Sequence, residues 1–259
     1  MKITVIGHWG GVPKAGDATA GYLFQEEGYS LLVDCGSAVV SNLQKYLDLE
    51  DLDAVVLSHY HFDHFCDVGT LVYGRQILTR IGRLSRVLPI YGHEEETHFE
   101  ELTKEPYAQG IAYQEGETLE LGPFRIEFLK TQHPVLCFAM RITAGGVSVV
   151  YSADSSSFRG LADFAKDADL CMLECTLYPG YDGSAMGHMN STDAANLARE
   201  AGAKELLLTH LPIYGNTAQL LEDAVKHYEG KVSLASMGWT WEKGKRGEKP
   251  QEDSQGEHE

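Results

Sequence analysis

The chain has 259 residues, a formal net charge of −17 and a hydrophobic content of 43%. This length and hydrophobic content can bury a sizeable core, and five cysteines without a C-x-x-C pair predict neither a disulfide framework nor a zinc ribbon. The acidity argues against long nucleic acids as default substrates, because nonspecific nucleic-acid affinity comes mainly from Lys and Arg. The sequence shows no signal-peptide core and no stretch that would span a bilayer, so we expect a cytoplasmic protein.

Taken in chain order, the expected elements mix strands and helices without a linker between two halves. The β-rich start predicts a strand at 2–6, a Gly-rich loop at 7–21 and strands at 22–25 and 30–34. The apolar run at 54–57 is typical of a strand buried on both faces. Further strands are expected at 89–91, 124–130, 137–143, 147–151, 170–174, 205–209 and 231–234, and helices at 41–47, 67–80, 94–102, 160–165, 192–200 and 217–227. This order predicts one layered α/β domain over residues 1–242.

Three local patterns refine this prediction. Ser191 or Thr192 is expected to cap the helix at 192–200. Trp239 and Trp241 alternate as in a terminal strand that packs against the core. Residues 243–259 are polar and lack periodicity, so they are predicted to form a disordered tail.

A dense group of potential metal ligands follows the apolar run at 54–57. His59 and His61 are two residues apart, so in extended backbone they project the same way and can bind one metal ion. Asp63 and His64 come where the chain should turn toward a helix, which directs them toward a second position. Because imidazole and carboxylate groups suit zinc and similar metals, this segment predicts a metal site.

One loop cannot complete two coordination shells, and three further candidates follow other strands. His133, Asp154 and His210 each lie one to three residues beyond an expected strand. Functional side chains in α/β folds often stand at such positions. A single His there is more often a packing or hydrogen-bonding residue, but together with the first group we interpret these three as the remaining ligands. His93 and His98 are instead expected at the surface.

The order of these ligands resembles that of the metallo-β-lactamase superfamily over roughly residues 1–242. The resemblance implies an αββα sandwich that holds two divalent metal ions, with zinc as the first expectation and manganese as the alternative. It places His59, His61 and His133 on one metal ion, Asp63, His64 and His210 on the other, and Asp154 between them. It also implies a homodimer.

A narrower resemblance points to the ribonuclease Z-like branch. Residues 7–13 are similar to the Gly-rich first loop of that branch, and 187–193, which contain His188, to its extra histidine motif. Glu174 matches the glutamate that partners this histidine. Residues 152–156 and 208–212 resemble the corresponding segments of uncharacterised bacterial hydrolases still more closely.

One departure from ribonuclease Z bears on the substrate. That enzyme carries a long tRNA-gripping arm between the positions that match His133 and Asp154, whereas only 20 residues, 134–153, lie between them here. The missing arm and the net charge of −17 favour a smaller phosphodiester over tRNA.

We therefore expect a phosphodiesterase of small nucleotides or short nucleic-acid ends that uses a metal-bridging hydroxide. Asp63 would orient this hydroxide or take its proton, besides contacting the second metal ion. His188, held by Glu174, would stabilise the phosphoryl oxygens or protonate the leaving group. Two alternatives remain: a lactone or thioester hydrolase of the same fold, and a non-catalytic metal-binding regulatory protein.

Overall fold

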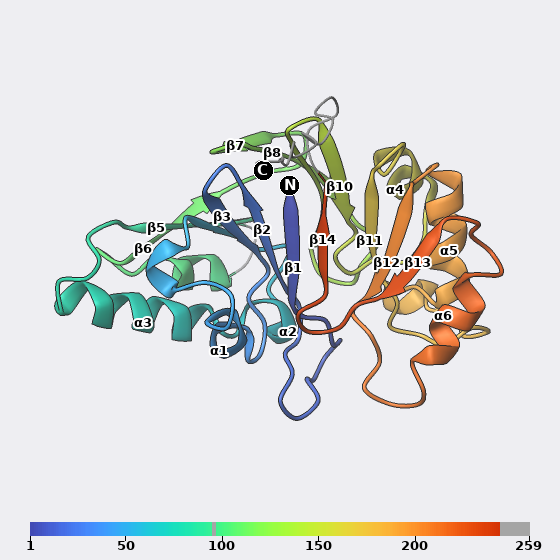
Figure 1. The fold of residues 1–259 in the computed structure, drawn as a ribbon, viewed down its shortest axis with the longest axis horizontal. Coiled ribbons are helices and arrows are strands. Elements are labelled where there is room, and N and C mark those ends of the chain that lie inside the picture. The colour runs from blue at the N-terminus through green and yellow to red at the C-terminus, as the bar shows by residue number, and fades with distance from the viewer. Residues whose placement is uncertain (95–96, 244–259) are drawn as a thin grey trace, which may run out of the picture.

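The structure, a computed structural model, describes residues 1–94 and 97–243. Within these residues, two seven-stranded mixed sheets face each other, and helices flank them on the outside (Figure 1). The predicted αββα sandwich in a single domain is therefore confirmed. The tail predicted at 243–259 lies, apart from Lys243, outside the described residues.

The first sheet takes most of its strands from the N-terminal half of the chain and one from the C-terminal end. In spatial order it contains β14 (Thr240–Glu242), β1 (Lys2–Gly7), β2 (Gly21–Glu26), β3 (Tyr29–Val33), β4 (Ala54–Val56), β5 (Leu88–Gly92) and β6 (Ala108–Ala112). Trp241 of β14 pairs with Ile3 of β1, which confirms the predicted terminal strand. Strands β3 to β6 run parallel, so their carboxyl ends meet at one edge of the sheet.

The second sheet repeats this plan with the C-terminal half of the chain. In spatial order it contains β13 (Lys231–Leu234), β12 (Glu205–Thr209), β11 (Leu170–Glu174), β10 (Val147–Tyr151), β9 (Phe138–Ala144), β8 (Phe124–Lys130) and β7 (Thr118–Leu121). Strands β7 to β10 are antiparallel, and β10 to β13 are parallel. The loops after β10, β11 and β12 therefore also leave one edge together.

The helices divide between the two halves of the chain. The first half contributes α1 (Val39–Leu43), α2 (Phe62–Phe65), α3 (Val68–Arg80) and the 3-10 helices η1 (Leu49–Asp51) and η2 (Thr97–Leu102). The second half contributes α4 (Arg159–Phe164), η3 (Ser184–Met186), α5 (Ser191–Glu200) and α6 (Ala218–Ala224). In Figure 1, α3 lies on the side of the first sheet, and α5 and α6 lie on the side of the second.

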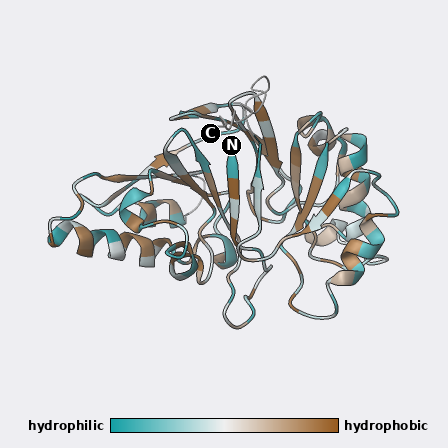
Figure 2. Cartoon of the chain, viewed as in Figure 1, coloured by the Kyte–Doolittle hydropathy of each residue, from teal (hydrophilic) through white to brown (hydrophobic). Residues whose placement is uncertain are grey.

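Buried apolar side chains form a core between the sheets and one beneath each helical layer. Figure 2 shows strongly hydrophobic residues along the strands of both sheets. Between the sheets, the ring of Phe24 on β2 meets that of Phe124 on β8 edge to face, with centroids 6.5 Å apart. Leu71 of α3 is buried against the first sheet and Leu197 of α5 against the second. Each fully buried side chain of this kind stabilises the fold by roughly 1.5 to 3 kcal/mol relative to its exposure.

Several predicted boundaries shift in the structure. The helix predicted at 41–47 is α1, which ends at Leu43 and begins earlier, where the Asp67 carboxylate accepts a hydrogen bond from Val40 N at 3.0 Å. The helix predicted at 94–102 is the 3-10 helix η2, which begins at Thr97, and residues 95–96 lie outside the described part of the chain. Strands β6 and β7 were not predicted, because AQGIA carries no clear alternation and TLEL, although it alternates, has only four residues.

The helix α5 is capped by a different residue from the two predicted. The side chain of Asn190 accepts a hydrogen bond from Asp193 N at 2.9 Å, and the Asp193 carboxylate accepts one from Asn190 N at 3.3 Å. The prediction of Ser191 or Thr192 was wrong, because both hydroxyls donate to the Asp223 carboxylate of α6, each at 2.7 Å. Those two residues therefore join α5 to α6 instead of capping it.

Candidate metal centre

The first group of predicted ligands lies directly after β4, where extended backbone turns into α2. His61 has extended dihedral angles and is the N-terminal cap residue of α2. His59 and His61 point to the same place, with His59 Nε2 3.1 Å from His61 Nδ1. His133, from the loop between β8 and β9, joins them with Nε2 3.2 Å from His61 Nδ1. The three side chains therefore converge, His59 and His61 as their spacing predicted and His133 as the resemblance implied.

A second group forms on the helical side of this turn. His210, which directly follows β12, lies with Nε2 3.0 Å from the Asp63 carboxylate. His64 Nε2 lies 3.7 Å from the same carboxylate oxygen. The potential ligand atoms of Asp63, His64 and His210 all lie within 4.8 Å of one another.

Asp154 stands between the two groups. Its Oδ1 atom lies 3.3 Å from His64 Nε2 and 3.4 Å from His210 Nε2. Its Oδ2 atom lies 3.7 Å from His59 Nε2 and 4.0 Å from His133 Nε2. One carboxylate oxygen therefore faces each group, as a bridging ligand would.

Two buried atoms at the centre of this cluster support a metal site. His64 Nε2 and Asp154 Oδ1 are both buried, and neither makes a hydrogen bond of normal geometry. Buried polar atoms rarely lack a partner in folded proteins, and an orphaned pair on imidazole and carboxylate groups is what a divalent metal ion would satisfy. The residues present therefore fit two divalent ions.

The two carboxylates of the cluster are held in the ionised form that metal binding requires. Burial alone would raise the pKa of Asp63, but the neighbouring His64 and His210 hold it well below its usual range. Burial alone would also raise the pKa of Asp154, but the positive potential of His210 and His64 outweighs burial and lowers this pKa.

The predicted pair of Glu174 and His188 is also assembled beside the cluster. Glu174 ends β11 and is fully buried, and its Oε1 atom accepts a hydrogen bond from His188 Nδ1 at 2.8 Å. Backbone N–H groups of Ser155 and Thr176 donate to the same carboxylate at 3.3 and 3.0 Å. Burial alone would lower the pKa of His188, but the hydrogen bond and charge of Glu174 raise it to about 9. The other nitrogen, Nε2, remains available to a bound molecule.

Comparison with known proteins gives the family. Residues 29–211 match the beta-lactamase superfamily domain. Over 243 residues the chain is 53% identical to the "Probable metallo-hydrolase YhfI" of Bacillus subtilis, an alignment that covers 93% of this chain and 100% of that protein. The chain belongs to the beta-lactamase superfamily.

Solved structures of the superfamily extend this result. The crystal structure of YhfI superposes with a TM-score of 0.91 at 51% identity, over 93% of this chain and 98% of that one. Human tRNase Z, short form, superposes with a TM-score of 0.72 at 20% identity, over 93% and 99% of the two chains. A diphosphatase from the PhnP family superposes with a TM-score of 0.71 at 19% identity, over 93% and 97%. The last two likenesses show the fold alone.

At this level the predicted enzyme class, a metallo-hydrolase of the metallo-β-lactamase fold, is confirmed. The resemblance to the ribonuclease Z-like branch is confirmed as well, since ribonuclease Z of Metallosphaera sedula is 25% identical over 271 residues, 86% of this chain and 93% of that protein. Among the described residues, no helix combines the length and apolar character needed to cross a membrane.

The structure adds a supporting residue that sequence reasoning missed. Asp34, directly after β3, accepts hydrogen bonds from Ser58 N at 2.7 Å, Ser58 Oγ at 2.9 Å and Tyr151 OH at 2.8 Å. Its Oδ2 atom also lies 2.8 Å from His64 Nδ1. A carboxylate on the outer nitrogen orients a ligand imidazole and makes it more basic, so Asp34 directs His64 Nε2 into the site. Asp34 adopts a positive φ of 58°. The sequence does not indicate this backbone angle, because an Asp at a strand end is compatible with many conformations.

Two further residues, Thr176 and Gly10, fix the position of His210. Sequence reasoning assigned neither of them this role. Thr176 Oγ1 lies 2.7 Å from His210 Nδ1, which leaves Nε2 facing Asp63. Gly10 lies so close that a Cβ atom there would stand 2.8 Å from the His210 ring. The Gly-rich first loop therefore has no room for a side chain at this point.

Proposed function

We propose that this protein is a dinuclear metal-dependent phosphodiesterase that acts on small nucleotides or short nucleic-acid phosphodiesters. The observation that carries the proposal is the buried Glu174 with its 2.8 Å hydrogen bond to His188, placed against a cluster that fits two metal ions. A lactone or thioester hydrolase needs an oxyanion site, whereas a phosphodiesterase gains from a cationic donor beside the phosphoryl oxygens.

The metal ligands in this proposal are those expected from sequence. One ion would be held by His59, His61 and His133, the other by Asp63, His64 and His210, and Asp154 would contact both. Zinc is the first expectation and manganese the alternative, because imidazole and carboxylate ligands accept both. Two such ions, when bound, lower the pKa of water and polarise a substrate oxygen.

Asp63 has a second role in the proposal. Its Oδ2 atom accepts a hydrogen bond from Gly11 N at 2.7 Å and lies 3.0 Å from His210 Nε2. Since both contacts use the same oxygen, the other carboxylate oxygen is left to orient the attacking water and accept its proton. The Gly-rich first loop thus fixes the orientation of this carboxylate.

His188 would act on the other side of the substrate. With Nδ1 engaged by Glu174, the ring presents Nε2, and His188 offers a potential ligand atom within 4.8 Å of those of Asp154 and His210. From there it can donate a proton to the leaving oxygen or a hydrogen bond to a phosphoryl oxygen. Glu174 acts through His188, so it is a positioning residue.

The surroundings of the centre support a small substrate. A cavity of about 360 Å³ reaches His133 and is lined further by Gln132, Ser156 and Ser184. Residues 134–153, where ribonuclease Z proper carries its arm, consist mainly of β9 and β10 of the second sheet. With no arm and a net charge of −17, a long polyanion such as tRNA would find little to bind.

The test is hydrolysis of bis(p-nitrophenyl) phosphate by protein reconstituted with zinc or manganese, with a chelated sample as control. Turnover that depends on metal supports the proposal. A fully metallated but inactive protein contradicts it, and lactone and thioester substrates would then be tested. Failure of every substrate class would favour a metal-binding regulatory protein.

A further inference from the structure

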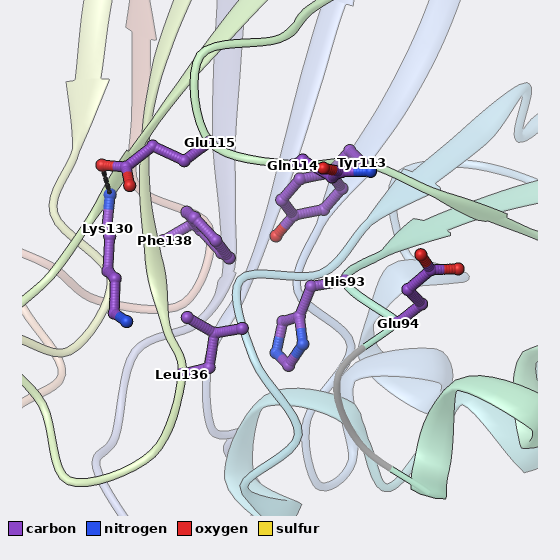
Figure 3. Close-up of a pocket in the computed structure, with 8 residues that line it drawn as sticks. All are labelled: His93, Glu94, Tyr113, Gln114, Glu115, Lys130, Leu136 and Phe138. Carbon is purple, nitrogen blue, oxygen red and sulfur yellow. Dashed lines mark hydrogen bonds between the residues drawn. The ribbon is translucent and has the colours of Figure 1, made fainter.

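A second cavity, of about 270 Å³, lies among the ends of β5, β6 and β8 and the loop that precedes β9 (Figure 3). Its lining includes His93, Tyr113, Gln114, Lys130, Leu136 and Phe138. None of these residues belongs to the groups that could hold a metal ion among the described residues. The cavity is therefore distinct from the metal centre.

The cavity nevertheless adjoins that centre through shared backbone. Tyr60, between the two histidines of the first ligand group, donates a hydrogen bond to the carbonyl of His93 at 2.7 Å. Phe138 N donates to the carbonyl of Ser58 at 3.2 Å, and Cys137 Sγ lies 3.5 Å from His59 Nδ1. The loop that supplies Leu136 to the cavity wall begins three residues earlier with His133. The cavity and the metal centre are therefore neighbours in the fold.

His93 is the feature of the cavity that calls for a ligand. It was expected at the surface, but the structure contradicts this: its exposed fraction is 2%, because it follows β5 and packs between Tyr60 and Phe138. Neither ring nitrogen makes a hydrogen bond of normal geometry. Figure 3 shows the ring between Leu136 and Glu94, in the cavity. The backbone of Leu136 lies near the ring, but not in that geometry. A buried imidazole so poorly satisfied is costly, so a group that bonds to it is expected.

The other walls indicate what kind of group fits. Tyr113 and Phe138 give an aromatic side, with ring centroids 5.4 Å apart and ring planes at 74° to each other. The rim mixes donors and acceptors: the amide of Gln114, the amine of Lys130 and the carboxylate of Glu94. Burial lowers the pKa of His93 to about 4, so the ring is neutral and can donate with one nitrogen and accept with the other. A second carboxylate, Glu115, accepts a hydrogen bond from Lys130 N at 3.1 Å and makes the cavity unfavourable for another anion.

We propose that this cavity binds the base of a nucleotide substrate while the phosphodiester lies at the metal centre. A nucleobase is neutral, planar and rich in both donors and acceptors, which is the combination that these walls offer. The volume is slightly below the roughly 300 to 1,000 Å³ of pockets that enclose whole ligands, so one base fits better than an entire nucleotide. This inference rests on the proposed phosphodiesterase function and names its substrate class.

The test compares two esters with the same leaving group, one with a base and one without. We expect zinc-loaded wild-type protein to prefer the p-nitrophenyl ester of thymidine 5′-phosphate over bis(p-nitrophenyl) phosphate. In His93→Ala and Gln114→Ala, the ratio of the two kcat/KM values should fall about tenfold, mainly through KM for the nucleotide ester. Gln114 is exposed, so its variant folds even if His93→Ala does not. His227→Ala, at a half-buried histidine beyond α6, should leave the ratio unchanged.

A binding measurement separates failure of this inference from failure of the proposed function. By calorimetry, wild-type protein should bind thymidine 5′-monophosphate about tenfold more tightly than 2-deoxyribose 5-phosphate, and His93→Ala should remove the difference. If neither ester is hydrolysed but this difference is found, the phosphodiesterase proposal is wrong and the base pocket stands. Equal binding of the two phosphates, or a ratio that both cavity variants leave unchanged, would mean that the cavity holds only water.

Discussion

At the scale of single residues, His188 is the side chain whose role is most sharply separable from metal binding. Its Nδ1 atom is engaged by Glu174, and it lies beside the ligand cluster without being needed to complete either predicted metal site. We expect His188→Ala to lower kcat for a phosphodiester about 100- to 10,000-fold, because a proton donor is lost. Metal content, measured by elemental analysis, should remain at the wild-type level.

Two comparisons give this prediction its controls. Glu174→Gln should lower kcat less than His188→Ala does, because the ring is still present but poorly oriented. His227→Ala should change neither quantity. Loss of metal from the His188→Ala protein would show instead that His188 is a ligand.

Asp34 carries a separate prediction at this scale. It touches His64 Nδ1 at 2.8 Å, while His64 Nε2 faces the site. We expect Asp34→Asn to weaken metal binding about 10- to 100-fold, as loss of such a supporting carboxylate commonly does. A chelator competition experiment measures this affinity, with Asp51→Asn, at an exposed carboxylate in η1, as the matched control. Equal affinities in the two variants would contradict the role given to Asp34.

The site also shows which residues a sequence can and cannot reveal. The predicted ligands were recognisable because metals demand particular side chains, and strand ends bring those side chains to one edge. Asp34 and Thr176 act through side-chain hydrogen bonds to ligand histidines from distant parts of the chain, and Gly10 acts through its close approach to His210, none of which residue type alone encodes. His93 was misjudged for the same reason, since its burial comes from the packing of β5 against the segment before β9.

At the scale of elements, the cap of α5 links local stability to the loop that carries His188. Asn190 and Asp193 form a reciprocal pair of hydrogen bonds, and Asn190 Nδ2 also donates to the carbonyl of Tyr181 at 2.8 Å. We expect Asn190→Ala to lower the free energy of unfolding by about 1 kcal/mol, a typical value for loss of a helix cap. Urea unfolding of the metal-loaded protein measures it.

The control for this prediction is Gln219→Ala, at an exposed position of α6, which should change stability by less than about 0.5 kcal/mol. If Asn190→Ala is equally mild, the cap contributes nothing measurable. Ser191 and Thr192 are unsuitable as controls, because their hydroxyls bond to Asp223.

The elements that sequence predicted best were strands of the second sheet, from β11, which is buried throughout, to β8, which alternates between buried and more exposed residues. Strands β8, β10, β11, β12 and β13 have the predicted bounds. Helix ends fared worse, since the bounds of α1 and the cap of α5 depend on Asp67 and Asp223, contacts from distant parts of the chain. Tertiary hydrogen bonds, rather than local propensity, thus set these boundaries.

At the scale of the whole molecule, the order of strands and helices predicted one layered α/β domain, and the resemblance carried by the ligand residues implied the sandwich. The homodimer and the cytoplasmic location stay predictions. Light scattering coupled to size-exclusion chromatography would measure the first, with a mass of twice 28.6 kDa expected and a monomer contradicting it.

We expect the stability of the whole fold to depend on metal. Its ligands come from both sheets, so without ions the two halves meet at orphaned polar atoms such as His64 Nε2 and Asp154 Oδ1. Ions present at about 1,000 times their dissociation constant stabilise the folded state by about 4 kcal/mol, which corresponds to a Tm shift of roughly 10 °C for a chain of this size. We therefore expect EDTA to lower Tm by this amount in calorimetry, and zinc or manganese to restore it, while magnesium, which prefers oxygen ligands, should not. If Tm is unchanged in protein that elemental analysis shows to be free of metal, the histidine cluster is stable without metal. Metal binding and folding would then be uncoupled.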